Sequence, residues 1–122
     1  MSIAARLTGV VLECPDPRAL AEFYSQITGW PIVNTDPDWY SIGENPAARP
    51  RLSFQLAPGH QPPHWPDPAS SMQFHLDFTV DDLDSAEQAT LALGATKFDE
   101  QPSPDSFRVF ADPVGHPFCL CV

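Results

Sequence analysis

The sequence predicts an α+β fold in which one strand–helix–three-strand unit, βαβββ, occurs twice within a single domain of 122 residues. Two observations predict it. A proline-rich stretch divides the chain near its middle, and the segments on its two sides follow the same order, with Gly9 at the place of His75. A repeated unit of this kind buries its apolar surface against its twin. The alternative is one ferredoxin-like sandwich with an extra hairpin.

The division of the chain follows from its prolines. The sequence has 15 of them, and they crowd between Pro58 and Pro68. Proline lacks an amide hydrogen and fixes φ, so this stretch resists both helix and central strand. We expect module one over about residues 6–57, a linker over about residues 58–71 and module two over about residues 72–122.

Each half begins with a buried strand, Leu7–Cys14 in the first and Gln73–Val80 in the second, because both runs are rich in β-branched and aromatic residues. A hairpin turn at Asp112–Gly115 joins the last two extended segments of the chain. The remaining expected strands are Trp30–Asn34, Trp39–Gly43, Arg51–Ala57, Thr96–Glu100, Phe107–Ala111 and His116–Val122.

A helix of about three turns follows the first strand of each half. Asp16 and Asp82 are the expected N-caps, because an aspartate side chain accepts hydrogen bonds from free amides of the first turn. Gly29 and Gly94 are the expected ends, since glycine readily adopts the left-handed conformation that terminates a helix. Apolar or weakly polar residues share one face of each helix: Leu20, Phe23, Tyr24 and Ile27, then Leu83, Ala86, Thr90 and Leu93.

Composition limits the partners. The formal net charge is −10, from six Lys plus Arg against 16 Asp plus Glu, so we expect neither nucleic acid nor an anionic membrane as a partner. No segment approaches the roughly 18 apolar residues of a membrane span, and the N-terminal residues do not resemble a signal peptide. An odd count of three cysteines is unlike a disulfide framework. These features predict a cytoplasmic location.

Several motifs together resemble the glyoxalase/bleomycin-resistance/dioxygenase group of the vicinal oxygen chelate superfamily, and in particular its glyoxalase-like members. The residues that carry the resemblance span Leu7 to Val122. They are Asp16-Pro17, Phe23-Tyr24, Gly29-Trp30, His75-Leu76-Asp77, Val80-Asp81-Asp82-Leu83, Leu93-Gly94-Ala95 and Asp112-Pro113-Val114-Gly115-His116-Pro117-Phe118.

The resemblance implies that each module forms a curved mixed sheet, that the two sheets form a cup, and that the protein is a homodimer. It also implies a metal held at four equivalent places, which transfer to Gly9, Gln55, His75 and Cys119. Only His75 has the usual ligand type. Because a catalytic divalent ion wants about three good protein ligands, we expect no metal and no other cofactor. If a metal is bound, zinc on His75, Cys119 and Gln55 is the conceivable site.

Strand alternation predicts which side chains face a ligand. With His75 on the cup side, Asp77, Glu13, Ser53 and Gln55 share that side. A histidine can act as general acid or base, but here a ligand contact or a structural hydrogen bond is the favoured role. Glu13 and Asp77 are candidate catalytic bases, or simply solvated carboxylates.

Three further residues are candidate ligand contacts. Cys119 is a small residue of the last strand, and only a positive charge near it would make its thiol reactive. Trp39 and Trp65 lie in or beside loops, where aromatic rings could stack on a planar ligand. Equally, both rings could cover the core or a dimer interface.

These observations predict a glyoxalase-like domain that binds a small organic molecule in the cup without a metal, and they leave open whether it also transforms that molecule. One alternative is a metal-dependent lyase, isomerase or dioxygenase that uses His75. Another is a protein that sequesters a drug without chemistry, as the bleomycin resistance proteins do. Fold alone does not choose among these activities.

Overall fold

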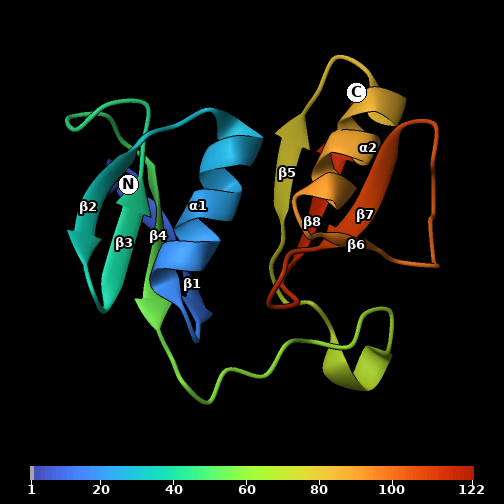
Figure 1. Ribbon diagram of the computed structural model, residues 1–122, viewed down its shortest axis with the longest axis horizontal. Coiled ribbons are helices and arrows are strands. Elements are labelled where there is room, and N and C mark those ends of the chain that lie inside the picture. The colour runs from blue at the N-terminus through green and yellow to red at the C-terminus, as the bar shows by residue number, and fades with distance from the viewer. Residues whose placement is uncertain (1) are drawn as a thin grey trace. The chain divides into compact units, whose positions relative to one another are not determined.

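The computed structural model describes residues 2–122. The chain forms two compact units, one that ends at His60 and one that begins at Gln61. Within the described residues each unit contains one α-helix and four strands in the order βαβββ, and each unit has its own four-stranded sheet (Figure 1). The predicted repeat and the α+β class are confirmed, and the single ferredoxin-like sandwich is excluded.

The first unit has the strand order β1-β4-β3-β2. Strand β1 pairs with β4 in parallel, and the other pairs are antiparallel. The elements are β1 (Gly9–Cys14), α1 (Pro17–Thr28), β2 (Ile32–Asp36), β3 (Trp39–Ile42) and β4 (Arg51–Leu56).

Helix α1 forms where the sequence predicts it and covers one face of the first sheet. The Oδ1 atom of Asp16 accepts the Ala19 amide at 3.2 Å, and Gly29 ends the helix with φ of 74°. Tyr24 is fully buried and stacks on Phe54 of β4 with ring centroids 5.7 Å apart. Side chains of the alternate residues therefore lie on the face that no helix of this unit covers, which we call the open face.

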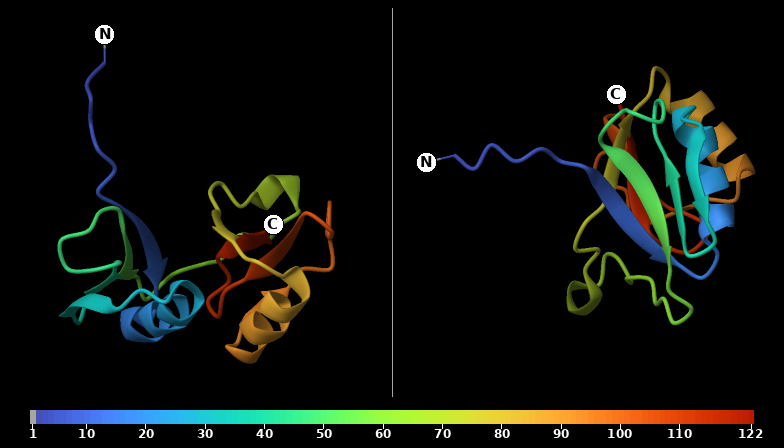
Figure 2. Two further views of the ribbon diagram at one scale, coloured as in Figure 1. Left: turned by 90° about the horizontal axis from the view of Figure 1, so that it is seen from above. Right: turned by 90° about the vertical axis from the view of Figure 1, so that its left-hand side faces the viewer.

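The second unit repeats this arrangement with the strand order β5-β8-β7-β6, and β5 is parallel to β8. Figure 2 shows each helix against one face of its own sheet. The elements are the 3-10 turn η1 (Pro68–Ser70), β5 (Leu76–Thr79), α2 (Leu83–Ala92), β6 (Thr96–Lys97), β7 (Phe107–Ala111) and β8 (Pro117–Cys121).

Helix α2 is held to its sheet by ion pairs as well as by apolar packing. The Arg108 guanidinium of β7 lies 2.9 Å from Asp84 and 3.2 Å from Glu87, both on α2. This contact shows that Arg108 lies on the helix side of the second sheet. The residues that alternate with Arg108 along β7, and their cross-strand partners, therefore lie on the open face of that sheet. The expectation that Leu93 shares the buried face of α2 is wrong, because the helix ends at Ala92 and Leu93 is exposed.

Most of the proline-rich segment packs on the second unit, although the sequence presents it as a linker. The ring of Trp65 meets that of Phe98 edge-on, with centroids 5.1 Å apart. Pro62 lies against Gly115, in the turn before β8. Proline excludes regular structure here, but it does not prevent the segment from packing.

The first strand of each unit is shorter than the sequence predicts. Strand β1 begins at Gly9, which pairs with Arg51, and β5 begins at Leu76, which pairs with Phe118. Strand β1 starts together with its partner β4, whereas β5 starts opposite the second residue of β8, so His75 precedes β5 instead of lying within it. Strand β6 is likewise only two residues long.

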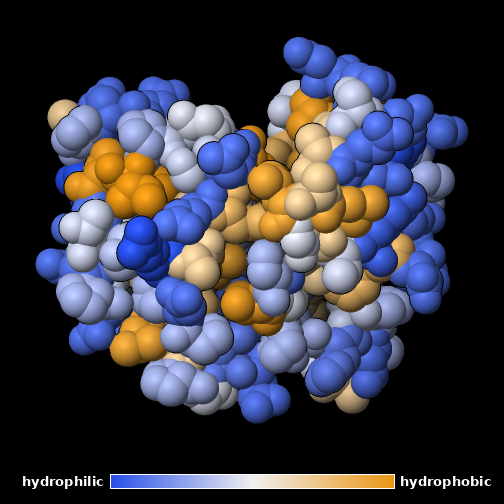
Figure 3. Space-filling view, in the orientation of Figure 1, coloured by the Kyte–Doolittle hydropathy of each residue, from blue (hydrophilic) through white to orange (hydrophobic). Residues whose placement is uncertain are grey.

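The visible surface is mainly hydrophilic. Hydrophilic residues occupy most of the surface visible in Figure 3. Among the described residues no helix has the length and apolar character needed to cross a membrane.

Candidate ligand and metal site

The open face of the first sheet brings three of the predicted site residues into one row. Glu13 of β1 is the cross-strand partner of Gln55, and Gln55 is in turn the partner of Trp39 on β3. Directly paired residues project to the same side of a sheet, so these three side chains are neighbours. All three are exposed.

Ser53 also lies on the open face, but its hydroxyl has an internal partner. It is only 5% exposed, and its Oγ lies 2.8 Å from the Oγ of Ser41, its cross-strand partner on β3. Two buried hydroxyls that bond to each other need no ligand. Sequence reasoning missed Ser41, because only the strand register reveals it.

Gly9 is closed to any ligating side chain. A Cβ atom built at this position would lie 2.9 Å from the carbonyl oxygen of Arg51, which belongs to the paired strand. A backbone atom cannot move aside easily, so a larger residue would disturb the β1–β4 pairing. One of the four metal positions that the family resemblance implies is therefore lost for a steric reason.

The open face of the second sheet brings together His75, Asp77 and Cys119. Asp77 of β5 and Cys119 of β8 are directly paired. His75 comes two residues before Asp77. One potential ligand atom from each residue lies within 4.8 Å of both others, and we call this group the triad.

Within the triad, an exposed contact between histidine and aspartate stands beside a buried thiol. His75 Nε2 lies 3.1 Å from Asp77 Oδ1, and the two side chains are 39% and 62% exposed. Cys119 is only 4% exposed. Val109 of β7, the cross-strand partner of Cys119, is buried as well. The exposed polar pair therefore lies beside two buried, weakly polar or apolar side chains.

Burial, followed by the negative charge of Asp77, raises the pKa of Cys119 to about 12. Burial also raises the pKa of Cys121, two residues further along β8. Arg108 of the neighbouring strand β7 is bound to Asp84 and Glu87 on the helix side of the sheet. Without a bound cation, Cys119 is therefore a protonated thiol near neutral pH and a poor nucleophile.

The donor atoms of the triad fit a borderline-soft divalent metal. Nitrogen, carboxylate oxygen and sulfur are the three ligand types that zinc accepts, whereas magnesium and calcium prefer oxygen alone. The sequence identified His75 and Cys119 for this role and named Gln55 as third ligand. Gln55 belongs to the first unit, whereas His75, Asp77 and Cys119 all belong to the second. Strand alternation places Asp77 on the same side as His75, and this was the signal that could have identified Asp77 as the third ligand.

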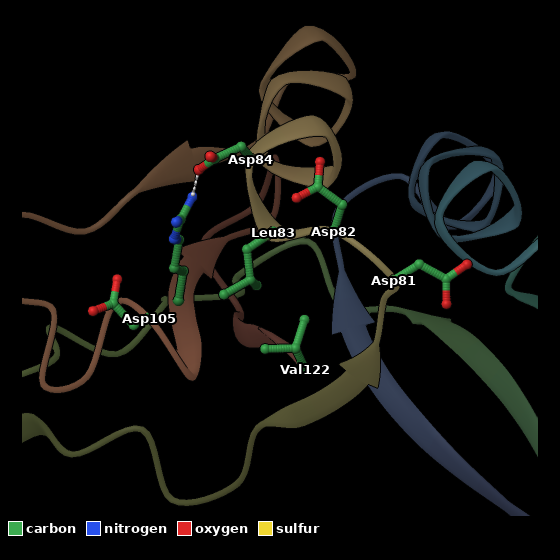
Figure 4. Close-up of a pocket in the computed structure, with 7 residues that line it drawn as sticks. Asp81, Asp82, Leu83, Asp84, Asp105 and Val122 are labelled. Carbon is green, nitrogen blue, oxygen red and sulfur yellow. Dashed lines mark ion pairs between the residues drawn. The ribbon is translucent and has the colours of Figure 1, made fainter.

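An acidic hollow lies at the N-terminus of α2 (Figure 4). Its volume is about 300 Å³. The one cation of its lining, Arg108, is paired with Asp84, so the hollow offers no free positive charge to an anion. The lining residues are Asp81, Asp82, Leu83, Asp84, Asp105, Arg108 and Val122.

Two βαβββ units, each with a helix on one face of a four-stranded mixed sheet, define the paired-module class of the vicinal oxygen chelate fold. A family model described as a glyoxalase-like domain matches residues 9–121. The chain belongs to this family.

Solved structures of the same fold support the assignment. The chain is similar to a glyoxalase/bleomycin resistance protein/dioxygenase family enzyme from Burkholderia phytofirmans, with a TM-score of 0.73, 19% identity and coverage of 95% of this chain and 97% of that one. It is also similar to a possible glyoxalase from Bacillus cereus, with a TM-score of 0.69, 18% identity and coverage of 98% and 100%.

The trypanothione-dependent glyoxalase I of Leishmania major shares the fold too, with a TM-score of 0.68, 16% identity and coverage of 97% of this chain and 86% of that one. No curated protein matches the chain. At these identities the solved structures establish the fold, and the family is established by the model that matches residues 9–121.

Proposed function

We propose that this glyoxalase-like domain binds a small organic molecule on the open face of its second sheet, with His75 and Asp77 as the polar contacts. The observation that supports this proposal is the 3.1 Å contact between His75 Nε2 and Asp77 Oδ1 on two side chains that remain exposed. Because both side chains remain exposed, their polar atoms are accessible to a ligand.

The pair has a definite chemical consequence. In a neutral imidazole, Nε2–H donates to Asp77 Oδ1, and Nδ1 then carries the lone pair. His75 can thus accept a hydrogen bond or a proton from a ligand, while Asp77 holds the ring in orientation. The buried Cys119 and Val109 give the pair an apolar surrounding, as small-molecule sites usually have.

A second candidate is a metal-dependent lyase, isomerase or dioxygenase, and the triad is the observation that favours it. His75, Asp77 and Cys119 would hold the ion. A bound divalent ion supplies Lewis acidity, which polarises an oxygen of the ligand. Recovery of a bound ligand unchanged after long incubation, with and without metal, would instead favour sequestration without chemistry.

The proposed partner is the small molecule alone. A net charge of −10 supports the exclusion of nucleic acid and of anionic membranes. The homodimer stays a prediction from the family resemblance, and sedimentation equilibrium at several protein concentrations would test it.

A thermal-shift screen tests the proposed function. A ligand at 100 times its Kd stabilises the folded state by about 2.7 kcal/mol, which is readily measured as a rise in Tm. Tag-free protein should be screened after chelator treatment, and each hit repeated on His75→Ala and Asp77→Asn. We expect both variants to lose at least about tenfold in affinity, the equivalent of about 1.4 kcal/mol.

Asp105→Asn is the matched control, because Asp105 is an exposed carboxylate of the same unit outside the triad. It should bind the hits as the unmodified protein does. Hits that bind all four proteins equally would place the ligand elsewhere and contradict the proposal.

A further inference from the structure

We infer that His75, Asp77 and Cys119 form a zinc site that is complete within the second unit. This inference concerns the face to which the proposed function assigns the ligand, but it does not need that function. It also revises the expectation of a metal-free domain, which counted ligands only at Gly9, Gln55, His75 and Cys119.

The backbone places the three ligands. Asp77 and Cys119 are paired across β5 and β8, so their side chains leave the sheet side by side. His75 reaches them from the residues just before β5, as its 3.1 Å contact with Asp77 demonstrates. No residue of the first unit is required.

The distances suit a zinc ion. Ligand atoms at zinc bond lengths of about 2.0–2.3 Å in a tetrahedron are about 3.3–3.8 Å from one another. The triad atoms already lie within 4.8 Å of one another. Small rotations about the side-chain bonds of the exposed His75 and Asp77 are enough to close this difference, and Cys119 need not leave its buried position.

The donor set selects the metal. One imidazole nitrogen, one carboxylate oxygen and one sulfur match zinc, and the sulfur disfavours magnesium and calcium. As the zinc–sulfur bond forms, the thiol proton of Cys119 passes to solvent. His75 Nε2 gives up its hydrogen bond to Asp77 in order to bind the metal. The proton that Nε2 carried is lost to solvent, and Nδ1 takes up a proton from solvent. Three protein ligands leave one coordination position open toward the open face.

This site differs from the pattern that the family resemblance implies. That pattern draws its ligands from both modules and includes the position of Gly9, which here has no room for a side chain. Asp77 stands outside the four positions. It is the residue that turns two ligands into three.

The test is zinc binding itself. Tag-free protein is stripped with chelator, incubated with zinc chloride, dialysed and analysed for metal by mass spectrometry. We expect one zinc per chain. Isothermal titration should show a loss of more than about 100-fold in affinity for His75→Ala and for Asp77→Asn, beyond the 10- to 100-fold that loss of an outer-shell partner costs.

Cobalt(II) provides a readout of the sulfur ligand. A thiolate-to-cobalt charge-transfer band should appear on titration and should be absent in Cys119→Ser. Cys121→Ser is the matched control, because Cys121 lies on the same strand and face but outside the triad. Its cobalt spectrum and zinc affinity should be unchanged. Should Cys119→Ser fail to fold, the exposed His75→Ala and Asp77→Asn still decide the question.

Zinc that is substoichiometric, or that binds all variants equally as an adventitious ion only, would overturn the inference. The two proposals fail in different ways. Suppose that the protein binds no zinc but binds a small molecule in a way that depends on His75. The zinc site would then be excluded, and the proposed function would stand. Stoichiometric zinc without any small-molecule hit would leave only the metal site.

Discussion

Gly115 packs so closely on Pro62 that a Cβ atom at position 115 would lie 2.4 Å from the proline Cβ. The contact ties the proline-rich segment to the turn before β8. Gly115 also has φ of 98°, a conformation that glycine adopts much more readily than other residues. Two separate physical reasons therefore require glycine at this position.

We expect Gly115→Ala to lower the free energy of unfolding by about 2–4 kcal/mol, because left-handed strain and overpacking each cost about 1–2 kcal/mol. Gly94→Ala is the control, since Gly94 also has positive φ but a Cβ there would meet Pro113 only at 3.8 Å. It should cost about 1–2 kcal/mol. Urea denaturation measures both.

Addition of Pro62→Gly to Gly115→Ala should recover part of the loss, because it removes the Cβ that clashes. A double-mutant cycle gives the coupling energy. Strictly additive effects of the two substitutions would contradict the packing described above.

Asp82 gives a prediction about pH. Hydrogen bonds from Ser85, first through its side chain and then through its backbone amide, lower the pKa of Asp82. A group with a lowered pKa stabilises the fold above its unfolded pKa of about 3.9 and loses that contribution as the pH falls through the folded value. Asp82→Asn should therefore lower Tm at pH 6 and leave it nearly unchanged in strong acid.

Circular dichroism melts between pH 7 and pH 2 test this prediction. Asparagine also caps helices, so the comparison isolates the charge and leaves the cap in place. A Tm difference that stays constant across the whole pH range would show that the carboxylate charge is irrelevant.

The hydroxyl pair of Ser41 and Ser53 predicts a structural role for Ser53. Ser53→Ala leaves the buried Ser41 hydroxyl without its 2.8 Å partner, and such a loss costs about 1–3 kcal/mol. The double variant Ser41→Ala/Ser53→Ala should cost less than Ser53→Ala, because no hydroxyl is stranded. Urea denaturation of the three proteins decides it, and a fully stable Ser53→Ala would speak for a ligand contact instead.

The cysteines should react in an order set by burial. Cys14 and Cys119 are buried, whereas Cys121 is partly exposed. In the native, metal-free protein we expect a disulfide reagent such as Ellman's reagent to label one thiol per chain first, and Cys121→Ser to remove that phase. All three thiols should react in urea. Rapid labelling of Cys119 would contradict its burial.

The sequence predicts those parts of the fold that depend on neighbouring residues. The N-caps at Asp16 and Asp82 and the helix end at Gly29 are confirmed, because each is decided within one helical turn. Strands β1 and β5 were predicted too long, because the start of each strand depends on its pairing with β4 or β8, which are distant in the sequence. Leu93 fitted the helical spacing, yet α2 ends before it.

The candidate site shows the same division. His75 and Cys119 could be singled out by resemblance, and strand alternation placed Asp77 on the same side. The three side chains lie close together only because Asp77 pairs directly with Cys119, and the pattern of residue types along each strand does not predict which residues pair. The partner of Ser53 and the packing of Trp65 on Phe98 were inaccessible for the same reason.

All three residues of the triad lie between positions 75 and 119, in the second half of the chain. Mutations in the first half therefore do not replace any of them. A substitution in β1, β3 or β4 can change Glu13, Trp39 or Gln55 without removing any member of the triad. The halves of this duplicated chain can therefore accumulate changes independently, one altering the row on the first sheet while the other keeps its histidine, carboxylate and thiol together.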